Sequence, residues 1–361
     1  MPRLPFTTAP IRSHLLAALT LGVVFATLGV LARPQPPTLS NVVSGDLALA
    51  ERARPYLAGA LDKVSIVTID GDSVTFAHFG ATNDTEYEIG SVTKTFTSLL
   101  FADAIQRGEV RADSKVSDFL VLTDSEIGAA TLADLASHRS GLSRQSSRMR
   151  DLLPMGLQLV RHRDPFMHDL DTIVTQAAES TLTGRGEFRY SNLGTALLGQ
   201  SLAVASGTEY AQLVEQRILA PLGMTATSVP VRASSLSNDA PTGYTRSGDA
   251  VAPWTLNAWA PAGGIRSTPA DMARYAQALL DGAAPGIDAM TPRFRFGELQ
   301  VGYAWITEEI DGRAMTWHNG ETGGFASMFI LDPSRHRAVI VLSNTAAPVD
   351  DAARALIGAS R

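Results

Sequence analysis

The sequence of 361 residues predicts a mixed α/β fold of the α+β type. In this fold, helices from the two chain ends flank an antiparallel β-sheet, and a large, mostly helical lobe is inserted into it. Two observations lead to this fold class: strand-like runs gather near both ends of the chain, and the middle shows mainly helical periodicity. The sheet lobe is therefore predicted over about 45–90 and 300–361, and the helical lobe over about 91–299.

The first strands form a predicted hairpin. Residues 64–69 and 73–77 flank Asp70-Gly71-Asp72, a sequence typical of a tight turn. Helical patterns at 46–57 and 350–357 are predicted to pack together on one face of the sheet, which would join the chain ends. Further antiparallel strands are expected near the C-terminus, at 303–306, 313–317, 325–331 and 338–342.

The N-terminal segment, residues 1–32, has the pattern of an export signal. Arginines precede an uncharged apolar stretch at 15–32, and a proline-rich linker follows at 33–44. The apolar stretch ends in small residues that suit signal-peptide cleavage, and it is also long enough to remain as a membrane anchor. Both interpretations stay open. Each places the folded domain, predicted at 45–361, outside the cytoplasm.

The composition narrows the possible classes of function. The chain has no cysteine, which excludes disulfides, thiolate catalysis and cysteine metal sites. Its seven histidines show no ligand spacing, so no metal and no other cofactor is expected. A net charge of −6 and a pI near 5.7 give no electrostatic support for binding nucleic acid. The densest run of arginines, at 139–163, is interpreted as a solvated surface of the helical lobe.

The segment Gly90-Ser91-Val92-Thr93-Lys94 is the first candidate catalytic motif. The chain has three lysines, and only Lys94 has a serine three residues before it. The apolar run that follows predicts a helix ending near Gly108, and residues at i and i+3 share one face of a helix. Ser91 and Lys94 are thus predicted to meet at the helix N-terminus, where a lysine of lowered pKa can activate a serine nucleophile. The alternative interpretation is a capping serine followed by an unrelated lysine.

Two further motifs carry candidate site residues. Tyr190-Ser191-Asn192 follows a glycine turn and precedes a helical run at 193–205. The Lys94 ammonium is expected to lower the pKa of Tyr190, so that the phenol can relay protons, and Asn192 is expected to bind a substrate amide or to fix the lysine. A buried tyrosine beside an Asx turn is the alternative. His318-Asn319-Gly320 is expected to follow a strand, where the glycine lets a substrate approach the backbone.

In this order, the three motifs resemble those of the serine penicillin-recognising superfamily, which includes class C β-lactamases, D-alanyl-D-alanine carboxypeptidases and related esterases. Stretches at 135–142, 221–224, 262–268 and 339–344 are also similar to family members, so the resemblance covers about 45–360. It implies a β-lactamase/transpeptidase-like fold and an acyl-enzyme mechanism. The second motif is like that of the class C and carboxypeptidase branch.

The resemblance also implies a role for each site residue. Ser91 would be the acylating nucleophile, Lys94 and Tyr190 the base system, and Asn192 a substrate-positioning residue. The oxyanion hole would consist of the backbone N–H groups of Ser91 and of Glu321, the residue after Gly320. His318 stands where the family has a lysine, and His138 resembles a structural position, for which a satisfied loop histidine is expected.

The histidine in the third motif leads to an expectation about substrates. His318 with an ordinary pKa near 6.5 is mostly neutral at pH 7, whereas a lysine offers a permanent cation to a substrate carboxylate. Neutral esters or amides are therefore expected to be better substrates than carboxylate-bearing β-lactams or D-Ala-D-Ala ends. The segment with Trp254, Trp259 and Ala262-Gly263-Gly264 is a candidate for a wall of the substrate cleft, and the alternative is that its aromatic side chains only pack in the core.

Three functions remain at this point. The first is an exported serine hydrolase that acts on a small ester or amide or on a peptidoglycan peptide. The second is a β-lactamase or D-alanyl-D-alanine carboxypeptidase in the strict sense. The third is a non-catalytic protein that binds cell-wall fragments, which the intact set Ser91, Lys94 and Tyr190 argues against.

Overall fold

The computed structural model describes residues 36–122, 124–237 and 239–358. Residues 37–361 form one compact unit. The predicted leader at 1–32 and the first residues of the predicted linker lie outside the described residues. In the part that is described, no helix is both long and apolar enough to cross a membrane.

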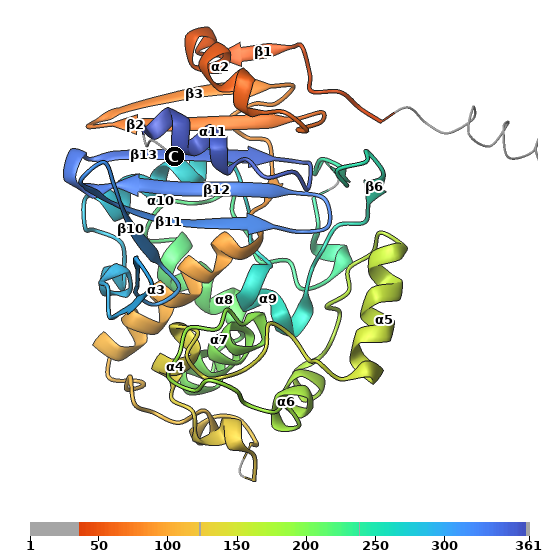
Figure 1. Ribbon diagram of the computed structural model, residues 1–361, viewed down its shortest axis with the longest axis vertical. Coiled ribbons are helices and arrows are strands. Elements are labelled where there is room, and N and C mark those ends of the chain that lie inside the picture. The colour runs from red at the N-terminus through yellow and green to blue at the C-terminus, as the bar shows by residue number, and fades with distance from the viewer. Residues whose placement is uncertain (1–35, 123, 238, 359–361) are drawn as a thin grey trace, which may run out of the picture. The chain divides into compact units, whose positions relative to one another are not determined.

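One antiparallel sheet dominates the described chain, in the strand order β1-β3-β2-β13-β12-β11-β10-β9-β8 (Figure 1). Its strands are β1 (Val43–Gly45), β2 (Val64–Asp70), β3 (Ser73–Phe79), β8 (Phe294–Phe296), β9 (Leu299–Val301), β10 (Ile306–Ile310), β11 (Arg313–Glu321), β12 (Ala326–Asp332) and β13 (Arg337–Ser343). Strands from the two chain ends lie side by side, because β2 pairs with β13 over their whole length. The antiparallel sheet and its many helices confirm the predicted fold class.

The helices and the short strands make up the rest of the described structure. The helices are α2 (Leu47–Ala53), α3 (Thr93–Gln106), α4 (Leu132–Ala136), α5 (Met149–Val160), α6 (Leu170–Ala178), α7 (Asn192–Ser206), α8 (Tyr210–Val214), α9 (Ala260–Gly263), α10 (Pro269–Leu280) and α11 (Asp350–Ile357). The short strands are β4 (Tyr87–Glu88), β5 (Gly243–Tyr244), β6 (Ala250–Val251) and β7 (Arg266–Ser267), which pair as β4–β7 and β5–β6.

The sheet has two apolar faces because side chains alternate along its central strands. On β12, Met328 and Ile330 belong to a core that includes residues of α2 and α11. Phe329 and Leu331 point the other way, into the larger core that contains α3 and α10. Figure 1 shows α11 in front of the sheet and α10 behind it. The helices at the chain ends thus cover one face of the sheet, as predicted, and the helical lobe packs against the other face.

Helix α3 is buried along most of its length, so its polar side chains need partners inside the protein. The Tyr275 hydroxyl of α10 donates to Thr95 Oγ1 at 2.9 Å. Thr97 Oγ1 donates to the Pro261 carbonyl of α9 at 2.7 Å. These hydrogen bonds fix α3 against α9 and α10, and thereby fix the N-terminal end of α3 at the boundary with the sheet.

The predicted hairpin is confirmed, since β2 and β3 pair around a turn in which Gly71 has φ of 57°. Two strand predictions near the C-terminus need correction. The strand expected at 303–306 begins only at Ile306, because Ala304 has a left-handed φ of 61° that interrupts extended backbone. Strand β11 runs on to Glu321, so His318-Asn319-Gly320 lies inside the strand and not after it; its pairing with β12 continues through all three residues.

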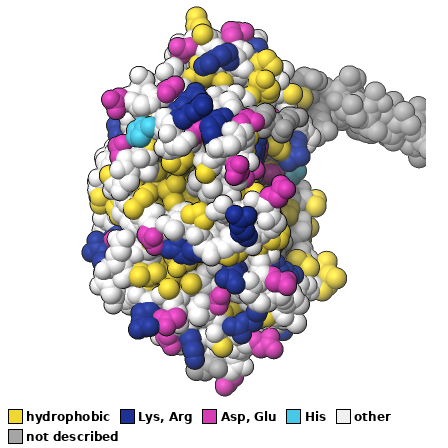
Figure 2. Space-filling view, turned by 60° about the vertical axis from the view of Figure 1, so that its left-hand side comes forward, with side chains coloured by type: hydrophobic (Ala, Val, Ile, Leu, Met, Phe, Trp, Pro, Cys, Tyr) yellow, Lys and Arg dark blue, Asp and Glu magenta, His cyan; other side chains and the backbone are white. Residues whose placement is uncertain are grey.

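Charged side chains of both signs cover the face of the molecule in Figure 2. There, Lys and Arg side chains lie among Asp and Glu side chains, and no large block of one sign is visible. A polyanion binds best to a continuous basic surface. The face in Figure 2 offers no such surface.

A buried ion pair fixes the segment that leads into Gly90 and Ser91. Arg266, on β7, is 1% exposed and donates to Glu86 Oε1 at 2.6 Å and to Glu88 Oε1 at 2.8 Å. Glu88 Oε1 also accepts from the backbone N–H of Trp254 at 2.9 Å. Desolvation raises the pKa of Glu88, and the Arg266 cation opposes this rise. The carboxylate therefore depends on Arg266 to stay charged in the interior.

Arg266→Met is expected to destabilise the protein by about 3–5 kcal/mol, because it leaves the Glu88 carboxylate buried without a cation. Urea unfolding followed by circular dichroism measures the change. Arg111→Met is the matched control: its ion pair with Asp113 is exposed, with side chains 80% and 68% accessible, and its loss should cost less than about 1 kcal/mol. Equal losses in both variants would contradict this assignment.

Candidate active site

Ser91 and Lys94 meet at the start of α3. Ser91 lies in a single 3₁₀ turn, Gly90–Val92, which continues directly into α3. Lys94 Nζ lies 2.9 Å from Ser91 Oγ and donates to the Ala262 carbonyl of α9 at 2.5 Å. The spacing of three residues therefore brings the hydroxyl and the amine together, as the sequence predicts.

Burial controls the charge of Lys94. Its side chain is completely inaccessible to solvent. Desolvation holds the pKa of Lys94 well below its usual range, and the nearby Arg144 cation lowers it further. Burial thus favours the neutral form of the amine, whose lone pair can take the Ser91 proton.

The Tyr190 hydroxyl reaches the same point from the loop before α7. The next residue, Ser191, caps that helix: its Oγ accepts from Gly194 N–H at 2.9 Å. Burial raises the pKa of Tyr190 to about 12, although its hydrogen bond with Ser91 and the charge of Arg144 oppose the rise. The predicted lowering by a Lys94 ammonium is therefore wrong. A neutral amine has no positive charge with which to stabilise a phenolate, so Tyr190 stays protonated.

His138 supports the loop that carries Tyr190. Its Nδ1 accepts from the Ser191 backbone N–H at 3.2 Å, and its ring centroid lies 4.6 Å from that of Tyr190. Desolvation lowers the pKa of His138 well below its usual value, so the ring is neutral. The expectation of a satisfied histidine holds only for Nδ1, because the buried Nε2 has no hydrogen-bond partner among the described residues.

Strand β11 presents a backbone N–H beside Ser91. Thr322 N–H donates to Phe325 O at 2.9 Å, which makes 322–325 a hydrogen-bonded pair. Such pairs alternate in an antiparallel ladder, so the N–H of Glu321 points away from β12. It points toward the Ser91 turn, since a Cβ added to Gly90 would lie 2.7 Å from Glu321 N. A Cβ on Gly320 would lie 2.9 Å from Ser91 N. The backbone N–H groups of Ser91 and Glu321 therefore both lie where the Ser91 turn contacts the end of β11.

His318 is 2% exposed and neutral. Its Nδ1 donates to the Asn319 carbonyl at 2.6 Å, which leaves Nε2 as an acceptor without a partner among the described residues. Desolvation lowers the pKa of His318 to about 3, with a smaller effect from Lys94. The imidazole is thus neutral at pH 7, as predicted, and its ring centroid lies 6.2 Å from that of Tyr190.

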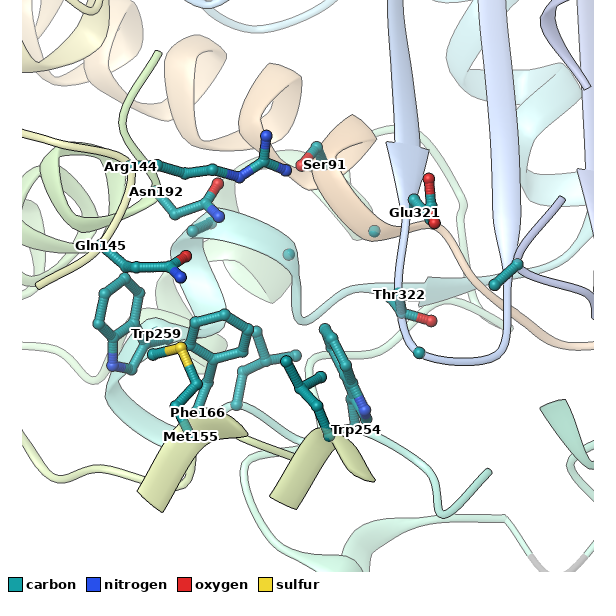
Figure 3. A pocket seen from close by; sticks show the side chains of 17 residues that line it. Ser91, Arg144, Gln145, Met155, Phe166, Asn192, Trp254, Trp259, Glu321 and Thr322 are labelled. Atoms are coloured by element: carbon teal, nitrogen blue, oxygen red, sulfur yellow. The ribbon is translucent and has the colours of Figure 1, made fainter. Parts of the chain in front are cut away.

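Two cavities meet at Ser91. The first, of about 380 Å³, has one wall of large apolar side chains, which includes both predicted tryptophans (Figure 3). The apolar residues of this wall are Met155, Leu159, Phe166, Trp254, Leu256 and Trp259. Asn192 and Gln145 are its amide side chains, and within the described residues no hydrogen bond joins Asn192 to Lys94. The second, of about 340 Å³, is lined by Tyr190, His318 and Gly320, and Glu321 borders both.

Arg144 is a site residue that the sequence reasoning missed. It lies in the arginine run that was interpreted as a solvated surface, yet it lines both cavities beside Ser91. Its Cζ lies 5.3 Å from the centroid of the Tyr190 ring. The prediction of a purely solvated run is therefore wrong at this position. No spacing rule identifies Arg144, since only tertiary packing carries it to the cleft.

The described residues offer no alternative metal site, because no three acidic or histidine side chains among them are grouped closely enough to hold an ion. The nearest candidates, His138 and His318, are both buried beside the Lys94 amine.

The charge of Lys94 can be measured directly, because the chain has only three lysines. Protein labelled with ¹³C at lysine Cε should give three resonances, and the Lys94 resonance should titrate well below the usual range for an amine, since burial favours the neutral form. Lys63→Arg and Lys115→Arg assign the other two signals. A Lys94 resonance that titrates only above pH 10 would show that the amine is charged and would refute its role as a base.

The chain resembles known proteins in sequence. A family model described as Beta-lactamase matches residues 50–360. The chain is 28% identical over 306 residues to a β-lactamase from Escherichia coli (strain K12), which covers 73% of this chain and 76% of that protein. It is 30% identical over 249 residues to the D-alanyl-D-alanine-carboxypeptidase/endopeptidase AmpH of the same organism, covering 62% of this chain and 59% of AmpH.

Solved structures show the same fold. A class C β-lactamase from Rhodobacter sphaeroides superposes with a TM-score of 0.73 at 22% identity, covering 86% of this chain and 98% of that one. The D-alanine carboxypeptidase AmpC from Burkholderia cenocepacia gives a TM-score of 0.71 at 24% identity, covering 86% and 99%. These likenesses confirm the predicted β-lactamase/transpeptidase-like fold. Because the family model spans most of the folded unit, the chain belongs to the β-lactamase family of serine hydrolases.

Proposed function

We propose that this protein is an exported serine hydrolase that cleaves an ester or amide through an acyl-enzyme at Ser91. The neutral Lys94 amine takes the proton of Ser91 Oγ as this oxygen bonds to the substrate carbonyl carbon. The carbonyl electron pair moves to the oxygen, which the N–H groups of Ser91 and Glu321 stabilise. When the carbonyl re-forms, the bond to the leaving group breaks, and the Tyr190 hydroxyl donates a proton to the leaving atom. The Lys94 ammonium then donates its proton to the Tyr190 oxygen, which restores both side chains to their resting forms.

Water then completes the cycle. It gives a proton to the same base system and attacks the acyl carbon, and the acid product leaves as Ser91 Oγ regains its proton. The raised pKa of Tyr190, about 12, fits this sequence, because the phenol must remain a proton donor in the resting site.

One observation carries this proposal: the completely buried Lys94 amine lies 2.9 Å from the hydroxyl of Ser91 at the N-terminus of a helix. A lysine that served only the structure would not need to be completely buried next to a serine, since burial of an amine without a counterion is costly. The helix N-terminus additionally favours the negative charge that develops at this point.

A narrower function, β-lactamase or D-alanyl-D-alanine carboxypeptidase, is the second candidate. It is favoured by the names of the relatives, among them a β-lactamase and the carboxypeptidase/endopeptidase AmpH. The apolar wall of the larger cavity, with Phe166 and Trp254, also suits an ester or amide whose acyl part is apolar. Peptidoglycan peptides, β-lactams and simple esters are thus the substrates to compare.

Export is part of the proposal and rests on the N-terminal sequence. The uncharged stretch at 15–32 follows arginines and precedes a proline-rich linker, the pattern of a signal peptide or an anchor. We propose that the folded domain works outside the cytoplasm, either released after cleavage or held at the membrane by this stretch.

Covalent labelling tests the acyl-enzyme. Residues 33–361 are incubated with a fluorophosphonate and, separately, with a penicillin, and the intact mass is measured. The wild type should gain one fluorophosphonate adduct and Ser91→Ala none, since the hydroxyl forms the new bond. A penicillin adduct or its turnover would favour the second candidate. Folded wild type that reacts with neither reagent would refute the acyl-enzyme and favour a protein that only binds cell-wall fragments.

Gly320→Ala tests the oxyanion hole. The added Cβ would lie 2.1 Å from Ile89 O and 2.9 Å from Ser91 N, so the Ser91 turn must move away from β11. Loss of one oxyanion donor lowers kcat about 10²- to 10³-fold, and a similar fall is expected for nitrophenyl ester hydrolysis. Gly156→Ala is the control, because nothing lies within 4 Å of a Cβ there. A folded Gly320→Ala protein with kcat within a few-fold of wild type would contradict the assignment of Glu321 N–H.

A further inference from the structure

Arg144 places a permanent positive charge at the point where the two cavities meet. It lines both of them together with Ser91. Figure 3 shows its side chain extending from the helical lobe toward Ser91, across the cleft from Glu321. The guanidinium also lies over the ring of Tyr190. Among the residues that the structure describes, no aspartate or glutamate forms an ion pair with Arg144.

Of the other charged or titratable groups of the cleft, Glu321 faces a cation, His318 is neutral, and Asp350 accepts a hydrogen bond from a neutral amide. Glu321 Oε1 lies 3.6 Å from Arg246 Nη2, so a cation already faces this carboxylate. Asp350 Oδ1 accepts from Asn319 Nδ2 at 2.8 Å. The His318 imidazole is neutral and offers an acceptor, not a cation, in the place where the family has a lysine. Arg144 is therefore the cation that lines both cavities beside Ser91, whereas Asp350 lines only the second of the two.

We propose that Arg144 is the residue that recognises a substrate carboxylate, so that the preferred substrates carry an anionic group close to the scissile carbonyl. A guanidinium binds a carboxylate through two parallel N–H donors, which fixes its orientation as well as its charge. This inference rests on the proposed acyl-enzyme function. It reverses the expectation of neutral substrates that His318 alone suggests, because the cation is supplied by the opposite wall of the cleft.

Arg144 borders both cavities, so the carboxylate can belong to the acyl part or to the leaving group, and the experiment separates the two. In the acyl arm, the 4-nitrophenyl monoester of glutaric acid is compared with the 4-nitrophenyl ester of glutaramic acid. In the leaving-group arm, the butyrate ester of 4-hydroxybenzoate is compared with that of 4-hydroxybenzamide. The members of each pair have nearly the same size and differ in one negative charge.

In at least one arm, wild type should hydrolyse the anionic member with the higher kcat/KM. Arg144→Gln should lower kcat/KM for that member about 10- to 100-fold, which is the usual loss for one hydrogen bond to a charged group. Arg144→Gln should lower kcat/KM for the neutral member by a smaller factor, so that the ratio of anionic to neutral rates falls, and Arg144→Lys should retain part of the preference. Because the two members share the same catalytic groups, any effect of Arg144 on Lys94 cancels in the ratio of their rates.

Arg161→Gln is the matched control, since it removes an equal charge from an exposed residue at the end of α5. Its ratio of anionic to neutral rates should equal that of wild type. Equal loss for both members in both arms of Arg144→Gln would overturn the inference and leave the acyl-enzyme intact. Failure of wild type to hydrolyse the neutral esters and to react with a fluorophosphonate would instead count against the proposed function.

A binding measurement keeps the inference testable if turnover is slow. The ¹³Cε resonance of Lys94 is followed while glutarate, 4-hydroxybenzoate or the corresponding amide is added. At least one carboxylate should shift this resonance at a concentration about tenfold or more lower than its amide does, and Arg144→Gln should remove the difference. Wild type that binds each carboxylate no better than its amide would refute the anion site.

Discussion

The site depends on one backbone contact, between the end of β11 and the turn that carries Ser91. Gly90 and Gly320 allow it: a Cβ on either residue would overlap the backbone across the interface, at 2.7 Å from Glu321 N or 2.1 Å from Ile89 O. The Ser327 hydroxyl strengthens the contact, donating to Ile89 O at 2.8 Å. Because Ser91 belongs to the helical lobe and Glu321 to the sheet, the same contact joins the lobes and brings two N–H donors to one place.

Desolvation decides the charge of the groups around this contact. An amine, a phenol and two imidazoles lie within a small buried region, and burial favours the neutral form of each. A neutral lysine can accept a proton and a neutral tyrosine can donate one, so the two side chains hold complementary roles at rest. The cost of burial falls mainly on Lys94, whose partners are a hydroxyl and a carbonyl instead of a carboxylate.

The cleft combines an apolar wall with the exposed cation of Arg144. Aromatic and aliphatic side chains line the larger cavity, and the third-motif histidine contributes no charge. Arg144 lies on the opposite side of the cleft from Glu321. The Glu321 carboxylate is paired with Arg246. Family membership does not determine such an arrangement, because substrate preference comes from the side chains that line a site and not from its fold.

Features that depend on neighbours along the chain can be predicted from the amino-acid sequence. Local periodicity and turn chemistry predict the meeting of Ser91 and Lys94, the hairpin around Gly71 and the helix after Ser191. Together with the order of the three motifs, these features are enough to predict the fold class. The other features of the site arise from contacts between distant parts of the chain. Strand register directed the Glu321 N–H toward Ser91, and burial reversed the expected direction of the Tyr190 pKa shift. Long-range packing carried Arg144 from a run of surface arginines to the cleft. These features depend on distances between residues that are far apart in sequence and on the effective dielectric constant around buried groups. A short sequence motif specifies neither of these quantities.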